Sequence, residues 1–450
     1  MYQRLAKNIL LPILDLCQRS NVAYCWKVLE NAQYLKRDEI VDLQQRKMRT
    51  LLKHAYENVP YYRTAFLKQG VNPDDIRTVE DLRKLPVLKK TVLRNTPQQL
   101  MAGNIPRRQL VLCRTSGTTA VPLSFYRTRE DVDWGTAAWL RAYRWGKCEL
   151  GDKHAVIWAF DARELRNPLR RVINLLHREH LLLNAYEMSE ATIRLSARRI
   201  QELRPKFLMG YSYSIHLLAN YLLEAGIRTP ELKAIFACTQ TLLPSQRREI
   251  EMAFGCGVYD LYASREFSLM ASECEKHVGY HIQSENVLLE FLKDGEPVSP
   301  GETGTILVTS LNNYAMPFIR YEIGDTGKPS DDTCSCGRGL SLFKSLEGRT
   351  TRGFEYFVTG DGSLLFLRDM EKIFGRLPVK TFQIVQEKRD EILVKVVKAN
   401  GYSEKDTNFI KRNLVWGHSQ QITNVEVEFV KSIPLEKSGK KRYFNSRLTE

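Results

Sequence analysis

The spacing of apolar residues along the chain changes several times, and each change predicts a different element. In residues 35–70 apolar side chains recur every three or four positions, which is typical of a helix with one buried face. Pro60 interrupts this spacing, so we expect the helix to end just before it. Residues 79–99 predict a second pair of helices, broken at Pro86. The first 100 residues are therefore expected to be largely helical.

Short apolar, partly β-branched runs then alternate with helix-like stretches. The predicted strands lie at 110–112, 155–159, 207–209, 234–237 and 258–261, and the predicted helices at 129–143, 189–203, 215–225 and 244–254. Strands that alternate with helices are typical of α/β folds with mostly parallel strands.

From about residue 280 the pattern becomes that of β hairpins, expected at 281–291, 304–311 and 318–321. Beyond residue 350, strands are predicted at 380–386, 391–397 and 421–430, with a helix at 404–414. We therefore predict an α/β protein of two domains. Residues 1–348 would form a large domain of stacked, mostly parallel sheets with a β-rich part at about 280–345, and residues 349–450 a small, mobile α+β lobe.

Composition and charge narrow the class of protein. The 450 residues are 43% apolar and 26% charged, which is ordinary for a globular chain and excludes disorder or coiled coil as a whole-chain description. The 67 Lys and Arg against 52 Asp and Glu give a net charge of +15, compatible with nucleic acid, an anionic membrane surface or polyanions such as ATP and CoA. The basic residues are spread along the chain without interleaved aromatics, so nucleic-acid binding is not expected.

Several features predict a cytoplasmic location. The nine cysteines are odd in number and mostly isolated, which favours a reducing compartment. No stretch is apolar for long enough to cross a membrane, and the start lacks a cleavage site of small residues. The apolar run 9–14, broken by Pro12, indicates an amphipathic helix. We expect it to pack on the domain, with contact to a membrane as the alternative.

Five polar segments are candidates for chemistry. Arg114-Thr-Ser-Gly-Thr-Thr-Ala-Val-Pro122 follows a predicted strand and offers hydroxyls, backbone N–H groups and a glycine, as a polyphosphate requires, although it lacks the lysine of a Walker loop. Glu266 follows the strand at 258–261, where a carboxylate could hold Mg²⁺. Asp325 follows the run 318–321, Arg349 lies at the change of composition, and Lys440 lies in a basic, glycine-containing loop. Singly, each is also explained as a turn, a hinge or a tail.

In this order the five segments resemble those of the adenylate-forming superfamily of acyl-CoA synthetases. More closely, the chain resembles the phenylacetate–CoA ligase branch and its CapK-like relatives in capsular polysaccharide biosynthesis. In that branch the glycine/threonine loop reads Thr-Ser-Gly-Thr-Thr-Gly-x-Pro-Leu, which corresponds to Thr115–Leu123 here. Further similarity at 54–63, 210–214, 244–251 and 301–309 extends the resemblance over about residues 35–445.

The resemblance implies roles for individual residues. Ser116, Gly117, Thr118 and Thr119 would hold the ATP phosphates, Tyr262 would lie near the adenine, Asp325 would take the ribose hydroxyls, and Arg349 would lie near the nucleotide at the hinge. Glu266 would help to bind Mg²⁺, and Lys440 would bond the substrate carboxylate and the α-phosphate. Trp134, Tyr211, Tyr213 and Ala237 would lie near the acid.

The implied reaction has two halves. A carboxylic acid and ATP would give an acyl-adenylate, and a thiol, either CoA or the phosphopantetheine of a carrier protein, would then capture the acyl group. The acid could be destined for a surface polysaccharide. Ala120, Gln240, Ala263 and Arg352 depart from the family pattern, so the alternative is a degenerate relative that acts as a binding or scaffold protein.

Four residues are candidates for a structural zinc site. Cys334 and Cys336 form a Cys-x-Cys pair, and Cys274 precedes two histidines, His277 and His281. Three thiols and an imidazole suffice for tetrahedral zinc, whereas reduced cysteines on a loop are the alternative. The resemblance implies zinc, because some members of the branch carry such a site, and it favours His281 over His277 as the fourth ligand.

Overall fold

The computed structural model describes residues 2–114, 123–158, 180–185, 187–188, 190–239, 242–347, 356–358, 364–366, 374, 377–389, 391–416, 424–433 and 444–446. Among these, no helix combines the length and the apolar character that a membrane span requires.

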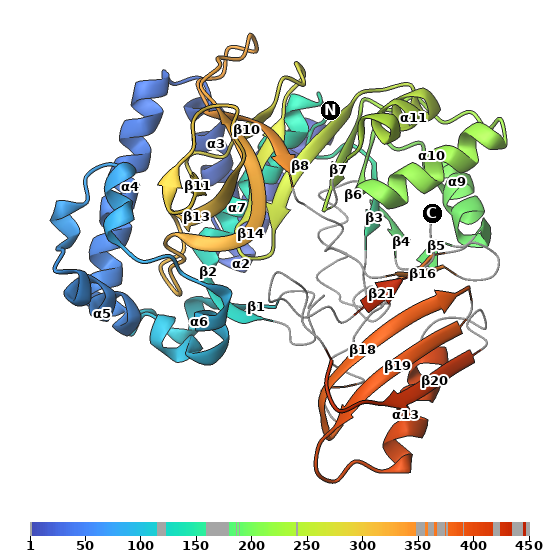
Figure 1. Ribbon diagram of the computed structural model, residues 1–450. Helices are drawn as coiled ribbons and strands as arrows, with labels where there is room; N and C mark the ends of the chain where they lie inside the picture. Colours follow the sequence, from blue (N-terminus) through green and yellow to red (C-terminus); the bar gives the residue numbers. More distant parts are fainter. Residues whose placement is uncertain are drawn as a thin grey trace.

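The chain begins with helices that pack around one side of a large sheet (Figure 1). α1 (Tyr2–Leu5), a π turn (Ala6–Leu10) and α2 (Leu11–Gln18) follow one another without a break, and α3 (Val22–Ala32) turns back beside them. α4 (Arg37–Asn58) ends where predicted, and α5 (Pro60–Gln69) starts at the proline, a residue suited to a first turn. The helix pair predicted for 79–99 is wrong in length: only α6 (Lys90–Asn95) and short 3₁₀ turns form, because two prolines punctuate this stretch.

One sheet of twelve strands runs through the described part of the molecule. Five neighbouring strands pair in parallel: β4 (His180–Asn184), β3 (His154–Trp158), β6 (Phe207–Tyr211), β7 (Ala234–Cys238) and β8 (Val258–Ser264). Alternate side chains of these strands enter two different cores. Ile235 and Ala237 face α9 (Glu190–Leu203), α10 (Ser212–Glu224) and α11 (Pro244–Phe254), whereas Phe236 and Cys238 face α3 and α7 (Arg129–Trp145).

The rest of the sheet is antiparallel. From β8 it continues through β9 (Ser268–Glu273), β10 (Tyr280–Ile282), β15 (Leu342–Glu347), β14 (Tyr321–Ser330), β13 (Gly304–Ser310), β11 (Val287–Lys293) and β12 (Glu296–Pro297). The α/β class and the β-rich part are confirmed, but parallel pairing is limited to one half of the sheet. The strand predicted at 318–321 is wrong, because β14 begins only at Tyr321 and Phe318 is a buried core residue.

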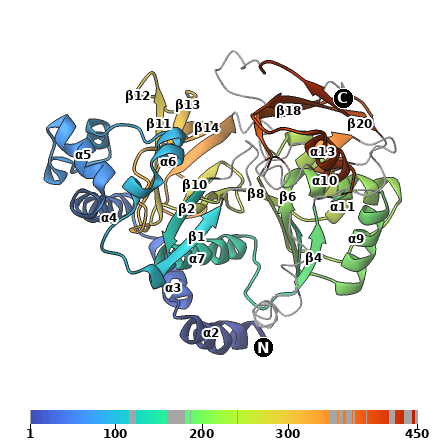
Figure 2. The ribbon, with the colours of Figure 1, turned by 90° about the horizontal axis from the view of Figure 1, so that it is seen from below.

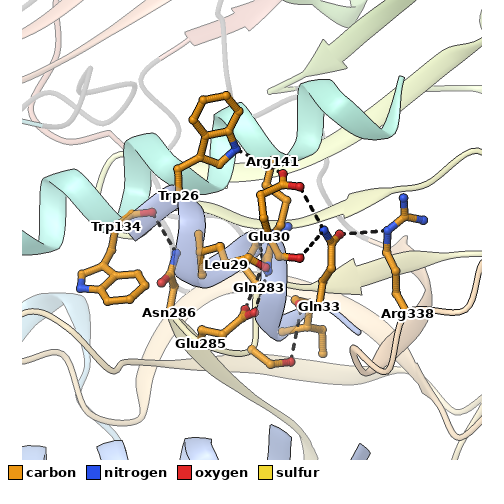
Figure 3. A network of polar contacts seen from close by, with 12 residues as sticks. Trp26, Leu29, Glu30, Gln33, Trp134, Arg141, Gln283, Glu285, Asn286 and Arg338 are labelled. Atoms are coloured by element: carbon orange, nitrogen blue, oxygen red, sulfur yellow. Dashed lines mark hydrogen bonds and ion pairs between the residues drawn. The ribbon is translucent and has the colours of Figure 1, made fainter. Parts of the chain in front are cut away.

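A buried polar network ties the helices to the sheet (Figure 3). The side chain of Arg141 on α7 is fully buried, and its guanidinium donates to both carboxylate oxygens of Glu285 at 2.6 and 2.9 Å. It also donates to Gln283 and to the carbonyl of Leu29 on α3. Removing one partner of such a pair strands a buried charge, so the network fixes how α3 and α7 sit on the sheet.

The C-terminal part has a sheet and a core of its own. β18 (Val379–Lys388), β19 (Glu391–Lys398), β20 (Asn424–Phe429) and β21 (Phe444–Ser446) form a four-stranded sheet, which α13 (Glu404–Trp416) covers. Phe382, Val394 and Ile410 lie in its core. β16 (Tyr356–Val358) and β17 (Leu364–Phe366) add to β5 (Glu187–Met188) in a separate sheet. The predicted boundary at 348/349 lies outside the described residues.

Candidate active site

The carboxyl ends of the parallel strands meet at one edge of the sheet. Ile157 pairs with Gly210, Gly210 with Ala237, and Ala237 with Asp260, so the residues that follow on β3, β6, β7 and β8 lie side by side. Gly210 is needed for packing, since a Cβ there would lie 2.5 Å from the carbonyl oxygen of Ile157. Ligands of open α/β sheets bind at this edge, which makes it the candidate active site.

Glu266 lies directly beyond this edge, in the turn between β8 and β9. Its side chain is buried, and no salt bridge joins it to another described residue. Its charge acts on Arg127, which is buried and bonded to Asp131. Burial alone would lower the pKa of Arg127, but the carboxylate of Asp131 and, more weakly, that of Glu266 raise it. Glu266 is therefore a buried carboxylate that retains its capacity to bind a cation.

Asp325 accepts a hydrogen bond from Tyr262 and lies at a β-bulge between β13 and β14. The Tyr262 hydroxyl donates to Oδ2 of Asp325 at 2.9 Å. The expectation that Asp325 follows a strand is wrong, because it lies inside β14. Between the pairs Thr305–Thr326 and Leu307–Glu322 the two strands lose register, and Gly324 takes a φ of +92°, which favours glycine.

The ring of Tyr262 is fully enclosed in the core, and Phe343 lies edge-on to it at 6.0 Å. This leaves the hydroxyl, rather than the face of the ring, as the group that Tyr262 offers to the site.

A second tyrosine–aspartate pair lies close by but deeper in the sheet. The Tyr280 hydroxyl donates to Oδ2 of Asp260 at 2.5 Å, and Asp260 lies two residues before Tyr262 on β8. Both side chains of this pair are buried. This pair makes the same kind of hydrogen bond as Tyr262 and Asp325, but at a different place in the sheet. It can therefore serve as a control for substitutions in the Tyr262–Asp325 pair.

Tyr321, at the start of β14, is a site residue that the sequence did not reveal. Its side chain is fully buried, and its hydroxyl has no hydrogen-bond partner among the described residues. Burial raises the pKa of Tyr321, and the negative charges of Glu266 and Asp325 raise it further. The hydroxyl therefore lies in the electrostatic field of both candidate carboxylates. Only its place in an apolar run was visible in the sequence.

Three of the four residues expected around the acid share one core. Tyr211 and Ala237 are buried at the ends of β6 and β7, and Tyr213 packs partly buried against the same cluster. Trp158, at the end of β3, was missed; its ring lies 4.6 Å from that of Tyr211.

Trp134, the fourth, lies in a different core from the other three. It packs in the core between α3 and α7, with the ammonium of Lys47 at 4.2 Å over its ring. The sequence shows that residue 134 lies on a helix, but not which core that helix faces.

The remaining predicted residues lie outside the described part of the chain: Ser116, Gly117, Thr118, Thr119, Arg349 and Lys440. The described strands on either side of the phosphate loop are β1 (Leu110–Arg114) and β2 (Ser124–Thr128), and they pair antiparallel, with Arg114 opposite Ser124.

A candidate metal centre lies apart from this edge, in the antiparallel half of the sheet. Cys274 follows β9, His281 is on β10, and Cys334 and Cys336 lie between β14 and β15; one donor atom from each lies within 4.8 Å of the others. The sulfurs of Cys274 and Cys334 are 3.7 Å apart, and Cys336 Sγ is 3.4 Å from His281 Nε2. Thiolates bound to zinc at about 2.3 Å in a tetrahedron would lie roughly 3.8 Å apart, so the donor set fits zinc.

His277, the alternative fourth ligand, is engaged elsewhere: its Nδ1 lies 3.3 Å from Glu273 and 3.4 Å from Arg247. His281, in contrast, has its Nδ1 3.4 Å from the carbonyl of Leu340, which directs Nε2 toward Cys336. Burial lowers the pKa of His281 to about 4, so the imidazole is neutral and able to bind a metal.

Arg338 joins this cluster to the buried network. Its guanidinium donates to Gln33 at 3.1 Å (Figure 3). It also lies 4.8 Å over the ring of Trp145. Burial acts to raise the pKa of the Cys336 thiol, but hydrogen bonds from Arg338 outweigh it and lower that pKa. The cluster thus connects neighbouring ends of β10 and β15 in the interior of the protein.

Comparison with known proteins is consistent along the whole chain. The family model of the CapK C-terminal domain matches residues 357–447. Phenylacetate–coenzyme A ligase of Escherichia coli K12 is 31% identical over 298 residues, 64% of this chain and 67% of that protein. The enzyme of the same name from Pseudomonas putida is 30% identical, over 72% of this chain and 74% of that protein. Protein CapK of Staphylococcus aureus is 24% identical over 90% of this chain and 89% of its own length.

Among solved structures, 2-hydroxyisobutyryl-CoA ligase in complex with 2-hydroxyisobutyryl-AMP and CoA has the same fold. It superposes with a TM-score of 0.67 at 19% identity, over 93% of this chain and 92% of the other. The likeness covers the large sheet, its helices and the C-terminal part together.

Proposed function

The chain belongs to the phenylacetate–coenzyme A ligase family and is an AMP-forming acid–thiol ligase; from this premise we propose how its own residues bind the reactants. The carboxylate of a small acid attacks the α-phosphate of ATP, pyrophosphate leaves, and an acyl-adenylate forms. A thiol then attacks the acyl carbon, and AMP leaves with an oxygen that came from the acid.

The Tyr262–Asp325 pair is the observation that carries the proposed nucleotide site. Asp325 would accept hydrogen bonds from the ribose hydroxyls, and the 2.9 Å bond from Tyr262 would fix its orientation. Tyr262 is then a positioning residue rather than a base-stacking one, since its ring is enclosed. The two residues come from β8 and β14, and the bulge at Gly324 would set the position of Asp325 relative to Tyr262.

Glu266 is the residue that would hold Mg²⁺. A buried carboxylate without a salt bridge among the described residues fits a cation, because an unpaired buried charge is otherwise costly. Bound there, Mg²⁺ would supply positive charge to the phosphate oxygens of ATP. The buried hydroxyl of Tyr321 would donate a hydrogen bond to the same phosphate oxygens.

The proposed acid is aryl or short-chained. Tyr211, Tyr213 and Trp158 supply aromatic walls at the carboxyl edge, and Ala237, in the same core, contributes only a methyl group. Phenylacetate, the acid in the names of two relatives, matches such walls. We propose that the acyl group enters a surface polysaccharide, as the resemblance of the sequence to CapK-like proteins of capsular polysaccharide biosynthesis implies.

The proposed acceptor is a thiol, either that of CoA or that of a carrier protein's phosphopantetheine. Both are polyanions or carry phosphate, and the net charge of +15 attracts either one. Residues 1–348 and 349–450 would act as two domains, and rotation of the smaller one would bring Lys440 to the adenylation site and then withdraw it.

A screen of ATP–pyrophosphate exchange over a panel of carboxylic acids tests this function. We expect exchange that depends on the acid, with aryl or short acids best, and loss of at least a hundredfold in Glu266→Gln. Mass spectrometry after addition of CoA or a carrier protein then identifies the acceptor. A folded protein that binds ATP but catalyses no exchange with any acid would establish the alternative, a scaffold that has lost its chemistry.

We further propose that Cys274, His281, Cys334 and Cys336 hold one structural zinc ion. Four protein ligands leave no open position for a water molecule, so the metal would stabilise the protein rather than take part in the reaction. Metal analysis of protein without a polyhistidine tag should give about one zinc per chain. Cys334→Ser should lose the metal and melt at a lower temperature, whereas Cys256→Ser, away from the cluster, should keep it. Less than a tenth of an equivalent in the native protein would refute the site.

A further inference from the structure

The N-terminal helical segment, Tyr2–Gln18, is apolar on two faces. On the inner face, Ala6 and Leu11 are buried in the core that α3 and α7 share. On the outer face, Leu5, Ile9, Ile13 and Leu16 are exposed by 39%, 50%, 54% and 81%; we call these four residues the outer stripe. Contiguous aliphatic side chains on a protein surface are ordinarily covered by a partner or a membrane, so the outer stripe lacks its cover.

The segment is fixed to the protein, so the outer stripe has a defined direction. Gln3 donates to Asp152 at 3.0 Å, and a Cβ on Gly151 would come within 3.1 Å of the Ala6 methyl. At the other end, the carboxylate of Asp15 accepts from the backbone of Val22 and Ala23. Figure 2 shows α2 at the edge of the molecule, with α3 between it and α7.

Within residues 2–28, every exposed charge is positive. Arg4, Arg19 and Lys27 are exposed, and we call them the cationic rim; Lys7 is also exposed, but its ammonium lies 4.7 Å over the ring of Trp26 on α3. The only acidic residue between 2 and 28 is Asp15, which is buried. The excess of basic residues over the whole chain reinforces the local field. A surface that combines exposed aliphatic side chains with cations alone is complementary to an anionic lipid headgroup layer above an acyl region.

We propose that the outer stripe and the cationic rim bind the surface of an anionic phospholipid bilayer. The four aliphatic side chains would enter the boundary between headgroups and acyl chains, and the rim would lie among the phosphates. The protein would then be a peripheral membrane protein whose remaining helices and sheet stay in the aqueous phase. This inference is independent of the proposed acid, acceptor and zinc.

The same observations argue against a second copy of the chain as the partner that covers the outer stripe. A two-fold interface would place the cationic rim of one copy against that of the other, and like charges that face each other across an interface repel. A single segment of four turns or so also offers much less than the roughly 800 Å² per partner of a stable complex.

Vesicle flotation tests the proposal directly. The native protein should float with vesicles of equimolar phosphatidylglycerol and phosphatidylcholine, bind vesicles of phosphatidylcholine alone far less, and dissociate as salt is raised. Replacing the stripe with Ile9→Ser, Ile13→Ser and Leu16→Ser together should lower binding by a hundredfold or more, since each aliphatic side chain contributes about tenfold or more when buried. Arg4→Gln, Arg19→Gln and Lys27→Gln together should lower it by roughly a hundredfold, at about fivefold for each cation.

Matched variants on other surfaces control for loss of apolar groups and of charge. Leu67→Ser with Met252→Ser removes side chains that are 66% and 71% exposed on α5 and α11. Lys405→Gln, Lys411→Gln and Arg412→Gln remove three exposed cations from α13 and its start. Both controls should bind vesicles as the native protein does. All variants should keep the native melting temperature within a few degrees and the native rate of pyrophosphate exchange.

Three results would overturn the proposal. The first is no flotation with either vesicle at low salt. The second is flotation that the α13 control weakens as much as the rim variant, which would indicate adsorption by net charge. The third is a dimer in sedimentation that the stripe variant abolishes, with no preference for anionic vesicles.

Discussion

Replacing Tyr262 with phenylalanine separates a positioning role in the nucleotide site from a structural role. The change removes one oxygen atom and keeps the ring that packs against Phe343. Asp325 loses a hydrogen bond of 2.9 Å, and a bond from a neutral donor to a carboxylate contributes about 1.5–3 kcal/mol. We expect the free energy of unfolding to decrease by an amount within this range.

The effect on function should be smaller and specific to ATP. Asp325 keeps its charge but not its fixed orientation, so we expect the KM for ATP to rise roughly five- to twentyfold, equivalent to about 1–1.8 kcal/mol. The KM for the acid should not change, because Tyr211 and Ala237 lie in a different core. The assay is pyrophosphate exchange at saturating acid with varied ATP, beside denaturant unfolding.

Tyr280→Phe is the matched control. It removes the same kind of bond, from a tyrosine hydroxyl to the buried Asp260, which lies two residues from Tyr262 on β8. It should destabilise the protein by a similar amount and leave the KM for ATP unchanged. Equal rises in KM for the two variants, or no rise in either, would refute the assignment of Asp325 to the ribose.

Three further predictions test the reaction, the buried network and an electrostatic strain. Lys440→Ala should slow acyl-AMP formation about 10²–10³-fold and leave thiol capture from preformed acyl-AMP largely intact, with Lys441→Ala as the control; equal loss in both half-reactions would contradict the two-conformation account. Arg141→Met should destabilise by about 3–5 kcal/mol in urea unfolding, and adding Glu285→Leu should restore most of it; a double variant no better than the single would contradict the stranded-charge explanation. Burial lowers the pKa of Lys47 from 10.5 to about 8. The unfolded state therefore holds the proton that the folded state releases, so stability should rise as pH increases from 8 to 10.5. Lys47→Met should flatten this rise, and an identical slope in the variant would show that another group titrates.

The sequence predicted best what local spacing determines. The helices at α4, α7, α9 and α11 and the strands β3, β6, β7 and β8 follow from apolar periodicity and from prolines. Glu266 could be placed beyond a strand for the same reason. The burial of Glu266 and its closeness to Tyr321 could not be predicted, because both depend on strands that are distant in sequence.

Long-range register is the main reason why other predictions failed. Asp325 lies inside β14, at the point where β13 and β14 lose register, and this register depends on pairing between two segments that are distant in sequence. The separation of Trp134 from Tyr211 and Ala237 could not be foreseen, because helical spacing shows that one face of a helix is buried but not which core that face joins. The four candidate zinc ligands are spread over more than 60 positions, and a resemblance rather than their spacing brought them together.

Transfer of an isotopic label from the acid tests the central claim most directly. The acid that supports the strongest exchange would be prepared with ¹⁸O in its carboxylate and converted to the thioester, and the AMP and phosphate products would be analysed by mass spectrometry. If the carboxylate attacks the α-phosphate, each turnover leaves one labelled oxygen in AMP and none in pyrophosphate. Label in inorganic phosphate, with ADP as the nucleotide product, or AMP that carries no label, would contradict an acyl-adenylate intermediate.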